Sequence, residues 1–192
     1  MEPSSPTNDL NVIEGQLREA YGRVVWTHKT HEKAADIANR KAELVKIMQI
    51  AFSAVITSSL IVSLFGKGRL AAVLGTVLSA VLLGINLYLK NFNLGKSAQQ
   101  HTETAHKLWN IRESYLSLLV DMKLGSLDVG DIRLKRDQLQ EHLSKVYETA
   151  PRTNDKSYKK ASRALKSLEE LTFSDEEIDR FLPKLLRKDT KE

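Results

Sequence analysis

Two long uncharged stretches dominate the hydrophobic pattern of the chain. They run from Ile47 to Phe65 and from Leu70 to Leu89, 19 and 20 residues long, and neither contains an Asp, Glu, Lys, Arg or His. Because a helix rises about 1.5 Å per residue, each stretch is just long enough to cross roughly 30 Å of hydrocarbon. Core helices of a soluble bundle are the alternative, but these normally keep a charged, solvated face. The pattern therefore predicts a transmembrane helical hairpin over residues 47–89.

The basic residues around the hairpin predict its orientation. Positive charge within about 15–20 residues of a span favours the cytoplasmic side. The link between the spans, Gly66-Lys67-Gly68-Arg69, holds two basic residues, whereas the outer flanks hold six: Lys33, Arg40, Lys41, Lys46, Lys90 and Lys96. We therefore expect a two-span, multi-pass protein of the cell inner membrane with both termini cytoplasmic. The link is too short to form a domain, so any ligand should bind on the cytosolic side.

Apolar residues recur at three- and four-residue steps through most of the remaining chain, which is the period of an amphipathic helix. This predicts an all-α fold in which long cytosolic antiparallel helices extend the hairpin. Pro3 and Pro6 interrupt a polar stretch that has too little apolar surface to fold. The expected segments are, in order, a disordered N-terminus (1–10), a cytosolic helix (11–46), the hairpin (47–65 and 70–89), a second cytosolic helix (90–125) after a weak break at 91–95, and C-terminal cytosolic helices (126–192).

The C-terminal region has clear helix boundary signals. Ser174 and Glu177 form a capping box, which predicts a short helix beginning at Asp175. An earlier helix, restarted after Pro151, should present one apolar face: Ala161, Ala164, Leu165, Leu168 and Leu171. Its other face is basic: Arg152, Lys156, Lys159, Lys160, Arg163 and Lys166. That face could contact lipid headgroups, a nucleotide or only water, and a solvated face is the commonest case.

The hairpin also predicts which cytosolic residues face one another. If the chain folds back at the link, positions whose numbers sum to about 135 lie at the same height on two antiparallel helices. Trp26 and Trp109 then share a level, where we expect an aromatic layer. Four histidines lie near this level: His28, His31, His101 and His106. They could bind a metal or sense protons, but their spacing matches no zinc-protease pattern, and we expect polar packing between helices and no bound metal.

Polar residues are unevenly spread over the predicted spans. In the first span, five of them lie within an arc of about 160°: Gln49, Ser53, Thr57, Ser59 and Ser63. On the second span, one face holds three helix-packing candidates: Gly75, Ser79 and Asn86. Small residues four apart let helices approach closely. The stripe of the first span either packs against the second or lines an aqueous path, and because one hairpin cannot enclose a pore, the second alternative requires a homo-oligomer.

The composition excludes several classes of function. The chain has no Cys, which excludes disulfides, Cys-based metal sites and thiol chemistry. It contains no nucleophile with a base, no paired-carboxylate motif and no phosphate-binding glycine loop, so we expect neither an enzyme nor a cofactor. The formal charge of +5 suits a protein next to anionic lipid. Nucleic acid is disfavoured as a partner, because no zinc pattern or aromatic-rich strand motif accompanies the charge.

Two stretches resemble signatures of a known family. Residues 21–36, YGRVVWTHKTHEKAAD, are similar to the stretch before the first span in SLATT proteins, two-transmembrane effectors associated with SMODS and SLOG domains in bacterial conflict systems. Residues 136–139 (RDQL) and 146–153 (VYETAPRT) resemble the later motif of that family. The resemblance covers roughly residues 14–170. It implies no catalytic residues, only signature positions with a structural or sensing role: Tyr21, Arg23, Trp26, His28, His31 and Glu32.

The resemblance implies a pore-forming effector that acts in antiviral defence by abortive infection. On a signal, it would permeabilise the membrane of the infected cell. The chain shows no fused sensor domain, so the signal should come from a nucleotide second messenger or from a sensor or synthetase protein. The alternative is a non-conducting two-span membrane anchor, or scaffold, that assembles a cytosolic signalling complex. The expected partners are the lipid bilayer, further copies of the chain and one of these signals.

Overall fold

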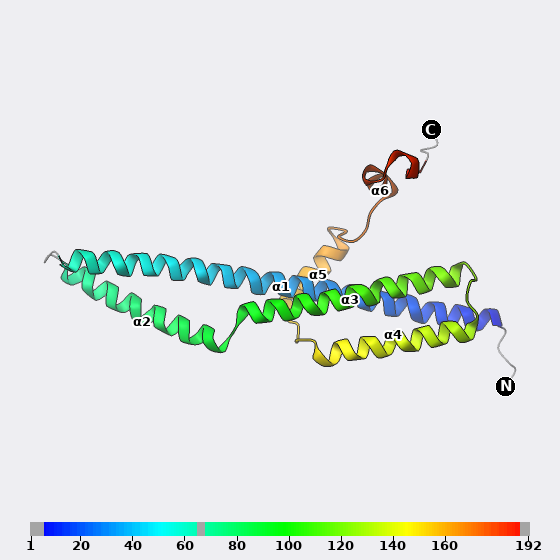
Figure 1. Ribbon diagram of the computed structural model, residues 1–192, viewed down its shortest axis with the longest axis horizontal. Coiled ribbons are helices and arrows are strands. Elements are labelled where there is room, and N and C mark those ends of the chain that lie inside the picture. Colours follow the sequence, from blue (N-terminus) through cyan, green and yellow to red (C-terminus); the bar gives the residue numbers. More distant parts are fainter. Residues whose placement is uncertain (1–5, 65–67, 189–192) are drawn as a thin grey trace.

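The protein is a long, narrow assembly of helices (Figure 1). The structure, a computed structural model, describes residues 6–64 and 68–188. Every regular element in these two ranges is helical, which confirms the predicted all-α fold. The elements are, in order, α1 (Pro6–Leu64), α2 (Arg69–Asn91), α3 (Leu94–Lys123), α4 (Val129–Thr149), α5 (Asp155–Lys166), α6 (Asp175–Phe181) and the 3₁₀ helix η1 (Lys184–Leu186).

One uninterrupted helix, α1, carries the chain from its N-terminal region into the hairpin. Its 59 residues span about 88 Å at about 1.5 Å per residue. The helix begins at Pro6, and proline fits the first helical turn because a backbone N–H there has no intrahelical partner. Residues 6–10 are therefore helical, which corrects the expected disorder over 1–10. Residues 1–5 lie outside the described ranges.

Gly68 lies close to the end of α1. The structure describes the predicted link from Gly68 onward, whereas Phe65, Gly66 and Lys67 lie outside the described residues. A Cβ atom at position 68 would lie 2.9 Å from the Cα of Ser63. Glycine is therefore needed here, because the two backbones approach too closely for a side chain.

The predicted break after the second span is present. α2 ends at Asn91, and α3 begins at Leu94 with Asn93 as its N-cap. The side chain of Asn93 accepts a hydrogen bond from the backbone N–H of Lys96 at 2.9 Å, which satisfies one of the unpaired N–H groups of the first turn. The break separates the second span, α2, from the second cytosolic helix, α3, which ends at Lys123.

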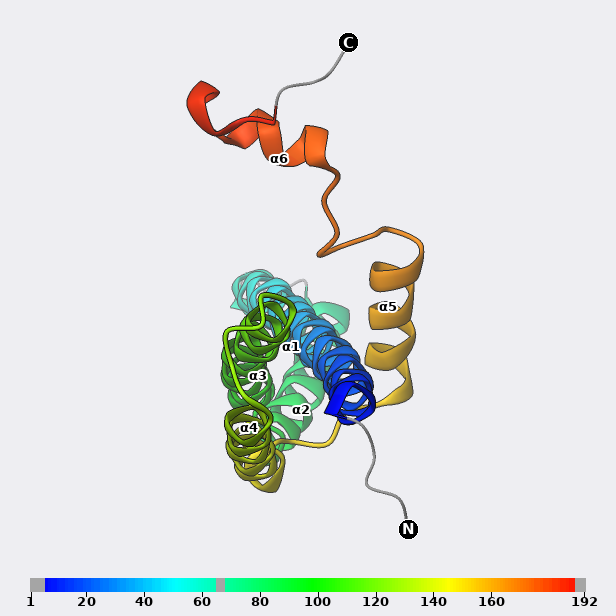
Figure 2. The same cartoon turned by 90° about the vertical axis from the view of Figure 1, so that its right-hand side faces the viewer.

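α1, α3 and α4 form the body of the protein beyond the hairpin (Figures 1 and 2). α3 runs antiparallel to α1, and α4 turns back after Gly125, whose φ of +66° is a left-handed conformation that favours glycine. The three helices pack their apolar faces on one another. The centre of this core comprises Leu17, Val24, Leu108, Ile111, Tyr115, Leu118 and Ile132.

The predicted register between α1 and α3 is close to the observed one, but the two tryptophans do not form a common layer. The ring of His28 lies against that of Trp109, with centroids 5.6 Å apart. Trp26 instead packs against Tyr158 of α5, with centroids 5.5 Å apart. The pairing of α1 with α3 could not reveal this contact, because α5 comes from far downstream and crosses α1 on another side.

The C-terminal region differs from the prediction in one helix and agrees in the next. α5 ends at Lys166, so Leu168 and Leu171 lie beyond the helix and not on its apolar face. Leu168 is exposed, and Leu171 has a φ of 78° that a helix does not allow. The capping box of Ser174 and Glu177 is present at the start of α6, as predicted. α6 and η1 project away from the body (Figures 1 and 2).

Candidate functional site: the hairpin and the buried polar cluster

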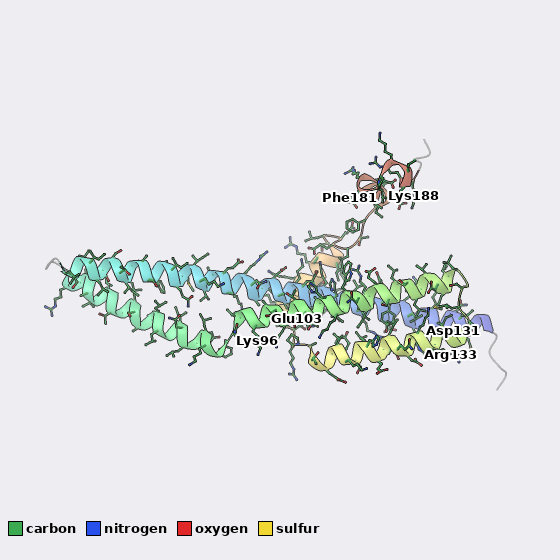
Figure 3. The ribbon with its side chains drawn as sticks, viewed as in Figure 1. Lys96, Glu103, Asp131, Arg133, Phe181 and Lys188 are labelled. Carbon is green, nitrogen blue, oxygen red and sulfur yellow. The ribbon has the colours of Figure 1, made fainter. Side chains whose placement is uncertain are left out.

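The hairpin carries its apolar side chains on the outside, where Figure 3 shows them radiating from the ribbon. Both helices are long and apolar enough to cross a membrane, and only 6% of the residues in each apolar window are buried. A core helix of a soluble protein would be mostly buried. The exposed side chains include Ile50, Val55, Leu74 and Val81. This exposure favours two membrane spans over the soluble-bundle alternative.

α1 and α2 meet along half-buried residues spaced three, four and seven positions apart. The closest approach is between Gly75 and Ser59. A Cβ atom at Gly75 would overlap the Oγ of Ser59 and lie 3.3 Å from its Cβ, so a larger residue would displace the hydroxyl from its hydrogen bond to the carbonyl of Ile56. Ser59 is 9% exposed. It therefore belongs to the interface between the helices, and not to an exposed stripe. Ser63 lies at the turn beside Gly68.

Polar groups of the two spans are hydrogen-bonded within the hairpin. Nε2 of Gln49 donates to Oδ1 of Asn86 across 2.6 Å. The hydroxyls of Ser53, Thr57 and Thr76 each donate to the backbone carbonyl four residues earlier. Such bonds satisfy donors that would find no partner in hydrocarbon. The hydroxyl oxygens keep lone pairs that can still accept a hydrogen bond.

Several of these polar residues lie on one side of the hairpin. Ser53 and Thr57 of α1, and Thr76 and Ser79 of α2, are exposed. Viewed along the chain direction, each of these residues lies about 80–140° round its helix axis from the side that faces the partner helix. The rotation has the same sense on both helices. Both helices are right-handed and they run antiparallel, so equal rotations place the polar residues of α1 and those of α2 on the same side of the hairpin. A shallow groove opens there, in which Thr76 and Ser79 lie among apolar residues that include Leu60 and Leu83. We call this side the polar face: Gln49, Ser53, Thr57, Thr76, Ser79 and Asn86.

Three of the four predicted histidines come together inside the body. The Nδ1 atoms of His31 and His101 lie 2.9 Å apart, and both rings are buried. Nδ1 of His28 donates to the carbonyl oxygen of Ala105 at 3.0 Å. Burial lowers the pKa of each ring below its ordinary value, and for His31 the neighbouring rings of His101 and His28 lower it further, to about 4. These imidazoles are therefore neutral at physiological pH.

The fourth histidine, His106, is exposed on α3 and does not join the others. Within residues 6–64 and 68–188, no group of three or more ligating side chains is placed to hold a metal ion. The three gathered rings instead bond to each other or to backbone. Their geometry is that of polar packing between helices.

A network of charged groups lies beside the histidines. Lys29 is 6% exposed, and its Nζ lies 2.7 Å from a carboxylate oxygen of Glu32 and 2.8 Å from one of Glu170. Nζ of Lys33 contacts the same Glu170 oxygen at 2.9 Å. Burial alone would lower the pKa of Lys29, but its hydrogen bonds to the two carboxylates raise it, and the two lysines lower the pKa of Glu170. The network thus remains charged, and it ties the segment after α5 to α1.

Glu32 was a predicted signature residue, whereas the other three members of this network, Lys29, Lys33 and Glu170, were not predicted as site residues. Lys29 follows His28 on the buried side of α1, and a lysine at that point of the helical period is a signal that could have identified it. No sequence feature links Lys29 or Lys33 with Glu170, because the contact joins positions far apart in the chain.

The remaining signature residues have separate structural roles. Tyr21 packs against the core of the body. Arg23 points outward, with its Nη1 3.0 Å from Oε1 of Glu19. The ring of Trp26 lies under Nζ of Lys166, 5.4 Å from the ring centroid. The signature residues all belong to α1, but they do not form one pocket, because they face α3, α5 or the surface.

The fold and the hairpin define a class: an all-helical, two-span membrane protein whose first span continues directly from a helical body. The description of one family fits this class, the SMODS and SLOG-associating 2TM effector domain family 4, and its family model matches residues 13–177. The chain belongs to this family, which confirms the SLATT resemblance. No curated protein and no solved structure matches the chain significantly.

Proposed function

We propose that the chain is a membrane effector of a bacterial antiviral conflict system, and that its copies form a homo-oligomeric pore that permeabilises the inner membrane. The polar face is the observation that carries this proposal. An exposed hydroxyl oxygen can accept a hydrogen bond from water but finds no donor in lipid. Several hairpins with their polar faces turned inward would enclose an aqueous path.

The opposite side of the hairpin supports the same arrangement. It lies on the other side of the contact between α1 and α2 and holds exposed aliphatic residues: Val55, Val62, Leu74, Val77 and Val81. The two sides of the hairpin therefore differ: the polar face carries hydroxyls among apolar residues such as Leu60 and Leu83, and the other side is mainly aliphatic. A ring of copies would use both sides at once.

The proposal places both termini in the cytoplasm, where the body would receive the signal. The signal would be a nucleotide second messenger or a sensor or synthetase protein, in keeping with the SMODS and SLOG association in the family description. α1 supports this division of roles, because one helix joins the body to the polar face. The proposal assigns no catalytic step to the chain.

Replacement of the polar face by apolar residues tests the pore. In the triple variant Ser53→Leu, Thr57→Leu, Ser79→Leu, signal-dependent release of dye and ions from liposomes should fall to the level of empty vesicles, because the path would lose its water contacts. Membrane insertion should persist, since leucine is favourable in hydrocarbon.

The matched control is Ser58→Leu. Ser58 is an exposed serine of the same helix, and it also bonds its own backbone, but it lies away from the polar face. It should leave release unchanged. Unchanged release of dye and ions in the triple variant would contradict the proposed pore.

A non-conducting anchor is the second candidate. The hydrogen bond between Gln49 and Asn86 favours it. Polar residues that bond to one another inside a hairpin hold the two spans together and need no aqueous path. Vesicles that stay sealed, with inserted and oligomeric protein and with signal binding verified, would establish the anchor in place of the pore.

A further inference from the structure

The last part of the described chain stands apart from the body. We call residues 173–188, which include α6 and η1, the arm. In the described ranges, the hydrogen bonds and ion pairs of the arm's residues join members of the arm only. Figures 1 and 2 show α6 held clear of the other helices. The arm's fold therefore does not depend on the body, and the body leaves it uncovered.

The arm exposes more apolar surface than a free segment would be expected to keep. Five large side chains within 16 residues are exposed, by 42 to 98%: Phe173, Ile178, Phe181, Leu185 and Leu186. Burial of such side chains against a partner is favourable. Exposed apolar side chains at this density mark an interaction site more often than a solvated surface.

The direction of the arm is fixed at its root. Glu169 and Leu171 have φ of 50° and 78°, both in the left-handed region that non-glycine residues rarely adopt. Between them Glu170 binds Lys29 and Lys33 of α1. These ion pairs hold a strained backbone that turns the chain away from the body. The ion pairs of Glu170 therefore set the direction in which the arm leaves the body.

α5 offers a surface of matching charge. Its outward side carries Lys156, Lys159, Lys160 and Arg163, which line a shallow hollow. None of the four takes part in an ion pair within the described residues. Asp155 also lines the hollow, whereas Tyr158 lies on the other side of α5 with its ring against Trp26.

α6 itself is acidic, because it carries four acidic residues and one basic residue beside Ile178 and Phe181. The rest of the arm adds Lys184, Arg187 and Lys188, of which Lys188 pairs with Asp175, so the charge complementary to α5 belongs to α6 and not to the whole arm.

The position of α5 excludes the membrane surface as the occupant of this basic side. α5 contacts α1 at Trp26, 21 residues before Ile47, and thus about 30 Å from the start of the apolar hairpin. Figure 2, a view along the length of the molecule, shows α5 from the side, so it runs across the body and not toward the membrane. Charges further from lipid than the Debye length, about 8–10 Å, are largely screened from it.

We infer that the arm of one copy docks on the basic side of α5 of the next copy. The contact joins two different surfaces, so every copy gives one arm and receives one. Repeated, such a contact forms a ring when the rotation between neighbouring copies closes, as the homo-oligomeric pore requires. The inference rests on the homo-oligomer of the proposed function but not on conduction through it. It adds what joins neighbouring copies outside the membrane.

The absence of cysteine from the chain permits a direct test. One tagged copy carries Phe181→Cys, and a second copy of different size carries Lys159→Cys. Both are expressed together in membranes and oxidised. We expect a disulfide-linked heterodimer, at several times the yield obtained when the second copy carries Leu134→Cys, an exposed position on α4. A single cysteine per chain excludes linkage within one copy.

Charge exchange gives an independent readout. Asp175→Lys with Glu176→Lys in the arm, or Lys159→Glu with Arg163→Glu in α5, should each lower self-association in membranes several-fold, and the combined variant should restore it. If the native chain is oligomeric, but the heterodimer yield equals that of the Leu134→Cys control and the combined variant stays impaired, the inference is overturned and the pore proposal stands. A monomeric native chain would overturn both.

Discussion

The imidazoles of His31 and His101 meet inside the body with their Nδ1 atoms 2.9 Å apart, so protonation of both rings would bring two cations together. The pKa of His31 is about 4 in the folded protein, against an ordinary value of 6.5. Between these two values the unfolded chain binds more protons than the folded one. The contribution of neutral His31 to stability is therefore complete above pH 6.5 and decreases as the pH falls toward 4.

We predict that the free energy of unfolding in detergent micelles falls between pH 7.5 and pH 4.5, and that His31→Gln reduces this fall. Glutamine can still form hydrogen bonds but does not titrate in this range. Chemical unfolding curves at several pH values measure the effect. His142→Gln is the control, because His142 lies on the surface of α4. Equal pH dependence of the native chain and the His31→Gln variant would contradict the assignment.

The sequence predicted the meeting of the histidines but not the contacts of Trp26 and Lys29. The fold-back arithmetic placed His28 and His31 opposite the segment that contains His101, because antiparallel helices of equal rise keep a fixed register. It could not place Trp26 against Tyr158 or Lys29 against Glu170. Those contacts depend on how α5 crosses α1, which no period in the sequence encodes.

Among the elements, the contact between α1 and α2 is set by Gly75. We predict that Gly75→Ala destabilises the hairpin by about 1–3 kcal/mol, the usual cost of overpacking, because the new methyl group would overlap Oγ of Ser59. Gly84→Ala is the matched control, since no atom lies within 4 Å of a Cβ there. It should be neutral or stabilising by up to about 1 kcal/mol. Unfolding of the two variants in mixed micelles compares them, and equal stability would show that the spans do not pack at Gly75.

The ends of the helices agree with the prediction where a local side-chain hydrogen bond determines them. The capping box at Ser174 and the break before Asn93 were both predictable, because a side chain bonds its own neighbouring backbone at each. The end of α5 was not. Leu168 and Leu171 continue the helical period, but Glu170 bonds to two lysines of α1, and this tertiary contact takes the chain out of the helix.

The polar stripe of the first span was also predicted as one set, and the structure divides it. Ser59 contacts Gly75, whereas Ser53 and Thr57 are exposed. A helical wheel gives the direction of each residue but does not show where the second helix lies. Only the position of α2 separates the packed residues from those of the polar face.

At the scale of the whole molecule, the continuity of α1 makes a further prediction. Glu43 is an exposed residue one turn before the apolar stretch. Glu43→Pro should remove a backbone hydrogen bond and kink the helix, at a cost of about 3 kcal/mol. Signal-dependent release from liposomes should then fall while insertion and the folded body are retained, since the two parts of α1 would no longer move together.

Glu43→Ala is the control for this variant, because it removes the same carboxylate and keeps the helix. Circular dichroism verifies the fold of the body in both. Full signal-dependent release from the proline variant would show that the body does not act on the spans through α1.

The length of α1 has a mechanical consequence. The part of the helix before the apolar stretch, residues 6–46, extends about 60 Å from the membrane. It is a lever whose fulcrum lies at the lipid surface. A rotation of about 10° at the fulcrum displaces the distal end by about 10 Å, the diameter of a helix. A ligand that shifts the far end of the body by one helix width therefore turns the spans by about 10°, and the force it exerts there is multiplied at the membrane.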